Sequence, residues 1–224
     1  MNYLRNEDFR LIIQDQNLQQ IISNDQTILD SAEIVAVEEI TSYLSQRYDT
    51  KTAFKNIQNF GAAIAFKKGD IIDLTAPPYA INTAYSTNAL VLSAGSIYRA
   101  LQSVNSITPT NDLVNWKLIS KDQTLFYAIL DSTGNYPDNA TYWAQGDNRY
   151  QLLVVYAVDV AIYHMLSRIS PRNIPQIRID RYESAKNHLD KIARGNINVE
   201  LPLLAPIQGS RVVYGGNAPI THFY

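Results

Sequence analysis

The chain has 224 residues, no cysteine and a nearly even charge, with 19 basic and 21 acidic residues. Without cysteine there is no disulfide framework, thiolate zinc site, iron–sulfur cluster or cysteine nucleophile. The even charge gives no overall field that would select nucleic acid or an anionic membrane. We expect a folded protein, because 46% of the residues are hydrophobic, and no signal peptide, because the first residues lack a basic region followed by an apolar one.

The N-terminal third of the sequence is helical in pattern. Apolar residues within 6–23 recur at three- and four-residue spacings and predict one or two short helices. A longer helix follows, capped by Asn24 or Asp25 and running to Tyr48. Its apolar stripe consists of Leu29, Ala32, Ala36, Ile40, Tyr43 and Leu44.

This long helix has more than one apolar face. Ile34, Val35 and Val37 lie off the main stripe. A helix that is apolar on a second face needs a second surface to cover it. We therefore expect it to contact a partner, such as a neighbouring subunit.

The helical period disappears after Tyr48, and residues 61–146 predict a β-rich block. Turn signals there separate short runs of β-branched and aromatic residues. The expected strands are Ala63–Phe66, Ile71–Leu74, Ala89–Leu92, Ile97–Gln102, Trp116–Ile119 and Leu125–Leu130.

One short pattern occurs twice in this block: an aromatic residue, alanine, a polar loop, proline and tryptophan. The two copies are Tyr98-Arg-Ala100 with Pro109 and Trp116, and Tyr127-Ala128 with Pro137 and Trp143. This suggests a repeat in which a strand leads into a loop turned by proline, and the tryptophan returns to cover the strand's aromatic residue.

These aromatic residues have two interpretations. Exposed aromatics on a small β scaffold stack on sugar rings, whereas buried ones form the core of the β block. The core interpretation is favoured, because the block is poor in Leu, Ile and Phe. Tyr98, Trp116, Tyr127 and Trp143 are nevertheless candidates for an interaction surface, together with Tyr214, Phe223 and Tyr224 of the C-terminal tail.

A second helical region begins near Asp147, which we expect to cap a helix over 148–169. This helix is apolar over most of its circumference. Because Asp159 and His164 interrupt its apolar stretch, which is too short to span a bilayer, we expect a buried helix and no membrane partner.

Two prolines, Pro171 and Pro175, end this helix. An amphipathic helix over Ile179–Arg194 follows, and Gly195 supplies a left-handed cap. Residues 203–224 show no periodicity but contain scattered apolar and aromatic residues. We expect this tail to be an extended arm that becomes ordered on a partner.

The sequence contains little material for catalysis. The three histidines, His164, His188 and His222, stand in no recognisable arrangement with a nucleophile, and there is no nucleotide-binding or metal-binding motif. We expect His164 to be packed and bonded to a neighbour, and His188 to be solvated. We predict no catalytic residue, cofactor or metal ligand, and no enzyme activity.

The apolar residues around Asp159 predict that its side chain is buried, and a buried carboxylate needs a basic partner. Of its two possible roles, an ion pair is favoured over a general base. We expect the partner to be a basic residue such as Arg47 or Arg168.

The two helical regions together resemble the head–tail connector proteins of bacteriophages, of the Mu-like prophage and head-completion type. The resemblance rests on the segment from Asp30 to Tyr48 with its Tyr-Leu-x-x-Arg-Tyr ending, and on a C-terminal signature. That signature is Arg181-Tyr182, Ala185, Leu189, Ile192, Gly195 and Ile197. The resemblance covers residues 5–58 and 147–202. The long β block between these two ranges departs from the family pattern.

The resemblance implies a structural protein of the virion neck, made in the bacterial cytoplasm. Its partners would be further copies in a dodecameric ring, the portal protein, the next tail or neck ring protein, and the DNA that passes through without sequence recognition. The chain also resembles the ring proteins of crAss-like phages.

The β block has a resemblance of its own. The run Gly95-Ser-Ile-Tyr-Arg-Ala100, followed by Pro109 and Trp116, is similar to small chitin-binding-type modules. This implies an alternative function, a carbohydrate-binding protein that acts through the aromatic β insert. In a connector, the same insert would bind glycans or other virion proteins.

The expected fold class is therefore α+β. A helical connector bundle of about four helices would be formed from residues 1–60 and 147–202. A β-rich module would be inserted at 61–146, and an arm would occupy 203–224.

Overall fold

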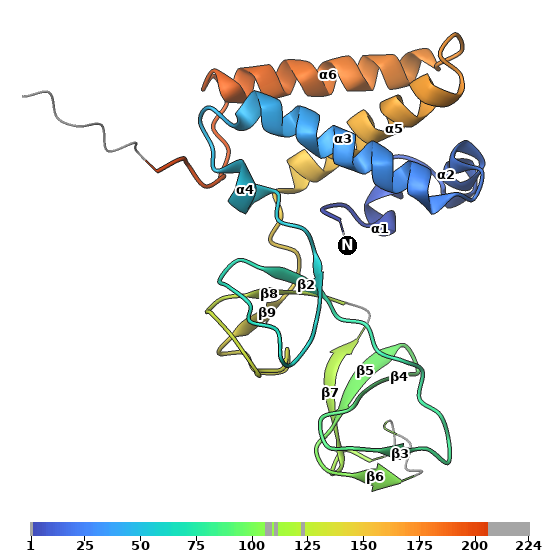
Figure 1. Ribbon diagram of the computed structural model, residues 1–224, viewed down its shortest axis with the longest axis vertical. Helices are drawn as coiled ribbons and strands as arrows, with labels where there is room; N and C mark the ends of the chain where they lie inside the picture. Colours follow the sequence, from blue (N-terminus) through green and yellow to red (C-terminus); the bar gives the residue numbers. More distant parts are fainter. Residues whose placement is uncertain (1, 106–108, 110–111, 122–123, 206–224) are drawn as a thin grey trace, which may run out of the picture.

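The computed structural model describes residues 2–105, 109, 112–121 and 124–205. Its fold is α+β, as predicted, with six helices and nine strands in this part of the chain. Figure 1 shows a layer of long helices with small sheets below it. Tyr214, Phe223 and Tyr224 lie outside the described residues, as does most of the predicted arm.

The helices come from both ends of the sequence. They are α1 (Asn6–Phe9), α2 (Asp15–Ile22), α3 (Gln26–Leu44), α4 (Thr50–Ala53), α5 (Gln151–Ile169) and α6 (Gln176–Ala193). The two short helices α1 and α2 confirm the interpretation of residues 6–23. Asp25 caps α3 by accepting a hydrogen bond from the backbone N–H of Thr27, also as predicted.

Three predicted helix boundaries are corrected. The helix α3 ends at Leu44 and does not continue to Tyr48. Asp147 does not cap α5, which begins after Tyr150, because the Asp147 carboxylate instead accepts hydrogen bonds from the backbone and side chain of Arg149. The last helix begins three residues earlier than expected, directly after Pro175. Gly195 has the left-handed φ of 78° that its position at the end of α6 requires.

The helical layer has one core, to which both ends of the chain contribute. α3 and α6 run along α5, and their buried faces meet on it. Ala36 and Ile40 of α3, Ala157 and Val158 of α5, and Leu189 of α6 are all fully buried. α5 is therefore the buried central helix that the sequence predicts.

Nine short strands form three small sheets. They are β1 (Gln58–Asn59), β2 (Ile71–Asp73), β3 (Ala84–Tyr85), β4 (Leu90–Ser93), β5 (Ser96–Ala100), β6 (Val104–Asn105), β7 (Trp116–Lys121), β8 (Leu125–Ala128) and β9 (Trp143–Gln145). The sheets have the orders β1-β2-β8-β9, β4-β5-β7 and β3-β6. The strand predicted at Ala63–Phe66 is wrong: residues 62–65 are exposed, and Phe66 forms only an isolated bridge to Ser132.

The sheets are nested within one another along the chain. β2 pairs with β8, so the whole β4-β5-β7 sheet is inserted between two neighbouring strands of the β1-β2-β8-β9 sheet. That sheet in turn is inserted between α4 and α5. Figure 1 shows the result: the β4-β5-β7 sheet and the β3-β6 pair lie farther from the helical layer than the β1-β2-β8-β9 sheet does, and we call them together the distal unit.

The twice-repeated sequence pattern has a structural counterpart. Ala100 is the register partner of Trp116 in the β5–β7 pair, and Ala128 is the partner of Trp143 in the β8–β9 pair. All four residues are buried. The tryptophan therefore returns beside the alanine and not over the tyrosine, because only the small side chain leaves room for an indole in the neighbouring strand.

The alanine–tryptophan pairing predicts a steric limit. Replacing Ala128 with Leu should lower the free energy of unfolding by about 1–3 kcal/mol, because the added methyl groups have no space beside Trp143. The measurement is urea denaturation followed by tryptophan fluorescence. Ala140→Leu, at an exposed position, is the control and should change stability by less than about 0.5 kcal/mol. Equal effects of the two substitutions would contradict the pairing.

Candidate interaction surfaces

The first predicted interaction residues lie in the core of the distal unit. Trp116 is 1% exposed and makes edge contacts with the rings of Tyr79 and Tyr85, at centroid distances of 6.4 and 5.5 Å. Tyr98 is buried in the same cluster. Neither residue presents a ring face to a sugar, so the structure corrects the candidate surface at these two positions.

Trp143 is buried in the other β core. Its ring lies 5.1 Å from Phe66 and 6.2 Å from Phe60, and its Nε1–H donates to the backbone oxygen of Asn135 at 2.9 Å. Because ring and N–H are both occupied, Trp143 also belongs to the core that the composition favoured. Tyr127 is half-buried against Ile71 and Leu125 and remains partly accessible.

A buried ionic cluster joins the start of the chain to its return from the β sheets. The guanidinium of Arg149, whose side chain is 1% exposed, binds both oxygens of Asp8 at 2.7 and 3.0 Å. It also binds Asp147 at 2.7 Å and donates to the backbone oxygen of Tyr3 at 2.6 Å. This one side chain fixes the positions of four segments: the N-terminal segment, α1, the turn after β9 and the start of α5.

The local electrostatics follow from this packing. Burial alone would lower the pKa of Arg149, but its hydrogen bonds to Asp147 and Asp8 outweigh that effect and raise it. Burial raises the pKa of Asp147, yet the bonds from Arg149 dominate and hold it below its usual value. Both shifts favour the charged forms of Arg149 and Asp147, and the guanidinium has the hydrogen bonds that a buried charge needs.

A second buried carboxylate, Glu33 of α3, has no cationic partner within the part of the chain that the structure describes. It is 4% exposed, and its Oε1 accepts a hydrogen bond from the backbone N–H of Leu4 at 2.8 Å. Burial raises the pKa of Glu33, and the hydrogen bond only partly offsets this. Its charge therefore opposes folding at neutral pH.

His164 forms a small polar cluster where α3, α5 and α6 meet. Its Nε2 lies 2.8 Å from Glu39, and the hydroxyl of Tyr182 donates to the other oxygen of Glu39, also at 2.8 Å. The Tyr182 ring stacks on Tyr163 with centroids 3.9 Å apart. The prediction that His164 is packed and bonded to a neighbour is confirmed.

The ion pair predicted for Asp159 is confirmed, but the expected partners are wrong, and so is the prediction that His188 is solvated. Asp159 pairs with Arg181 of α6, at 2.6 and 3.0 Å, and not with Arg47 or Arg168. Helix packing brings Arg181 over α5, a relation between distant segments that periodicity does not reveal. His188 is half-buried rather than solvated, and its ring stacks on Tyr156 at 5.7 Å.

An ionic cluster also joins the two β units. Asp138, whose side chain is 5% exposed, accepts hydrogen bonds from Arg99 at 2.7 Å and lies 2.8 Å from the Nζ of Lys117. Arg99 also lies over the ring of Tyr136. These residues line a polar cavity of about 360 Å³. Because Asp138 already engages both cations, the cluster holds the distal unit in place.

The outer side of α3 carries an exposed stripe with two aliphatic residues. Ile34 is 53% and Val35 44% exposed, and they lie between Ser31 and Glu38 on the side of the helix that faces away from the core. Val37 instead packs half-buried against the helical core. We call Ser31, Ile34, Val35 and Glu38 the α3 stripe.

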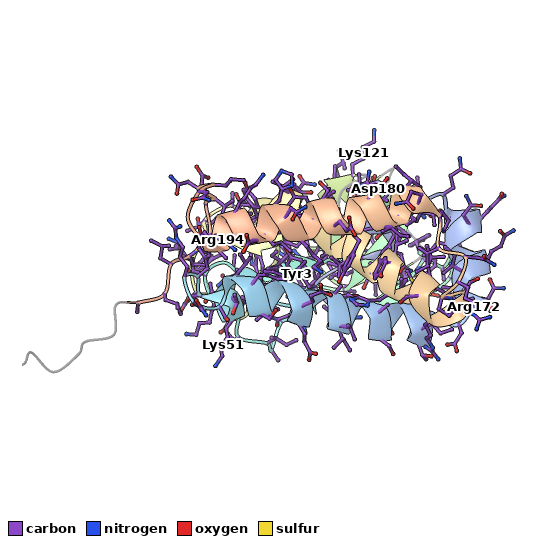
Figure 2. The ribbon with its side chains drawn as sticks, turned by 90° about the horizontal axis from the view of Figure 1, so that it is seen from above. Tyr3, Lys51, Lys121, Arg172, Asp180 and Arg194 are labelled. Carbon is purple, nitrogen blue, oxygen red and sulfur yellow. The ribbon has the colours of Figure 1, made fainter. Side chains whose placement is uncertain are left out.

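A second exposed apolar region lies where α5 turns into α6. Ile169 is 50% and Ile177 61% exposed, and Arg172 lies between them in the turn. We call these three residues the α5–α6 corner. Figure 2 shows Arg172 at one end of the helical layer, while α3 runs along its side.

Two further features of the structure concern metal ions and membranes. In the part of the chain that the structure describes, no group of three or more acidic or histidine residues is arranged to hold a metal ion. α5 is long and apolar enough, by length and composition, to cross a membrane. In this fold, however, its buried residues pack in the helical core.

Comparison with protein-family models, with curated proteins and with solved structures gives no match. Functional inference therefore rests on the surfaces described above.

Breaking the Arg149 cluster should destabilise the fold strongly. Arg149→Met leaves the buried Asp8 and the half-buried Asp147 without their cationic partner and should cost about 3–5 kcal/mol of unfolding free energy, measured by urea denaturation. Arg10→Met is the control, because the Arg10–Asp15 pair is exposed and its loss should change stability little. An Arg149→Met variant as stable as the control would show that the cluster does not hold the layer together.

The burial of Glu33 predicts that the stability of the protein depends on pH. Because its folded-state pKa is raised, its charge destabilises the protein above the unfolded-state pKa, about 4.3. Glu33→Gln should therefore be more stable than the wild type at pH 7, and the difference should vanish as the pH falls toward about 4. Thermal unfolding across this range measures it, with the exposed Glu183→Gln as control. A Glu33→Gln variant that is less stable at pH 7 would contradict the prediction.

Proposed function

We propose that the protein is a structural subunit of a bacteriophage neck, a head–tail connector that assembles into a homo-oligomeric ring. In this proposal the ring lies below the portal, binds the next tail or neck protein, and surrounds the DNA path. The localisation would be the virion, and the protein would act without enzymatic chemistry.

The observation that carries the proposal is the α3 stripe. Ile34 and Val35 are adjacent, exposed and held on a nineteen-residue helix whose other side is fully packed. Aliphatic side chains in such a rigid, prominent position form a contact surface for another protein. A connector subunit uses surfaces of this kind to bind its neighbours.

The helical residues that suggest the connector family support the same architecture. Ala185, Leu189 and Ile192 of the C-terminal signature are buried in the helical core, and Arg181 and Tyr182 bind α5 and α3. The signature therefore describes how α6 is attached to the other two long helices. In this way two distant parts of the chain form one layer.

The nested β sheets suit a projecting role in such a ring. They emerge from the helical layer between α4 and α5 and extend to one side of it (Figure 1). The distal unit also exposes Leu113 and Val114, at 73% and 81%. We propose that this unit contacts other virion proteins. The aromatic platform that favoured a glycan ligand is not formed at Trp116 or Trp143, since both are buried.

The test is the oligomeric state of the purified protein. We expect assemblies larger than a dimer in analytical ultracentrifugation and native mass spectrometry, and a ring with a central channel in electron micrographs. The double substitution of Ile34→Glu and Val35→Glu should raise the dissociation constant of self-association by about tenfold or more, because charges would enter an apolar contact.

A matched substitution makes this test specific. Leu113→Glu, in the turn before β7, adds a charge at an aliphatic residue that is more exposed than Ile34 or Val35, and it should leave the assembly intact. A wild-type protein that stays monomeric at high concentration and does not bind a portal protein would contradict the proposed function.

A further inference from the structure

The α3 stripe is acidic as well as apolar. Glu38 is exposed and has no hydrogen-bond or ion-pair partner among the described residues. Nor can a sequence neighbour neutralise it, since no lysine, arginine or histidine occurs between Leu11 and Gln46. The stripe therefore presents two aliphatic side chains beside an unpaired negative charge.

The α5–α6 corner has the complementary character. Ile169 and Ile177 are exposed, and the guanidinium of Arg172 has no hydrogen-bond or ion-pair partner among the described residues. Pro171 and Pro175 restrict the backbone of this turn, so that its side chains project from a stiff segment. The corner thus presents two aliphatic side chains beside an unpaired positive charge.

A hollow next to the stripe can receive an aliphatic side chain. It has a volume of about 170 Å³ and lies between α3 and α5. Its lining residues are Ile28, Ser31, Ala32 and Val35 of α3 and His164, Met165 and Arg168 of α5. Its walls are mostly apolar, and Ile177 is the most exposed of the corner's aliphatic residues. The hollow therefore suits an aliphatic side chain in polarity, and the unpaired charges of Glu38 and Arg172 are opposite in sign.

We propose that the α3 stripe of one copy binds the α5–α6 corner of a second copy, with Glu38 facing Arg172 across the contact. This inference rests on the proposed function and names the subunit contact that the ring would use. The stripe and the corner are different surfaces, so each copy in a pair still has one free stripe or corner. Contacts of this kind repeat from copy to copy and give a ring when the rotation closes.

Reciprocal charge reversal tests the contact. Glu38→Arg and Arg172→Glu should each weaken self-association about tenfold, because each places like charges opposite one another. The double variant restores opposite charges and should associate nearly as strongly as the wild type. Sedimentation velocity over a concentration series measures all four proteins, and circular dichroism verifies their fold.

Two further arms make the outcome specific. Glu183→Arg, on the exposed side of α6, makes the same charge change away from both surfaces and should leave association unchanged. Raising the salt concentration should weaken the wild type and the double variant alike, since exposed charge pairs are screened.

The outcomes separate the contact from the function. Loss in both single variants with recovery in the double variant supports the contact, whereas association that is insensitive to all three overturns it and leaves the ring to another surface. Recovery in an assembly that stops at two copies supports the contact but contradicts the ring. A wild type that never associates overturns both.

Discussion

The fold depends on the charged contact between Arg149 and the beginning of the chain. The helix α5 is separated from α1 by more than half of the sequence, and Arg149 is the residue at which the chain returns from the β-rich insert. By binding Asp8, Asp147 and the Tyr3 carbonyl, it fixes the direction in which α5 leaves the sheets. A buried arginine needs all of these partners, and so the geometry has little freedom.

The helical layer and its outer surfaces follow from that constraint. Once α5 is placed, α3 and α6 can bury their apolar faces on it, and Asp159–Arg181 and Glu39–Tyr182 fix the two outer helices relative to α5 and to each other. What remains exposed is then determined: Ile34, Val35 and Glu38 on α3, and the corner between α5 and α6. The nested sheets attach elsewhere, so they leave both surfaces open to other subunits.

The sequence allowed the elements to be predicted better than their partners. Apolar spacing placed α3, α5 and α6, since a helix that packs on one side repeats its apolar residues every three or four positions. The short strands β1, β3, β6 and β9 gave no such signal, because two or three residues are too few for an alternation. Contacts between distant segments, such as Arg149 with Asp8, were missed for a different reason: nothing in a local pattern shows which charge will face which. The off-stripe residues Ile34 and Val35 were the one local signal of a surface.

Self-association through the stripe and the corner can be tested by cross-linking, because the chain has no cysteine of its own. The measurement is disulfide formation in the double variant that carries Ile34→Cys and Ile177→Cys. Oxidation of a mixture of the two single variants identifies which residues form the bond. The account predicts a ladder of covalent species that continues beyond the dimer, with residue 34 of one copy joined to residue 177 of another. Monomers alone, or bonds only between identical positions, would contradict it.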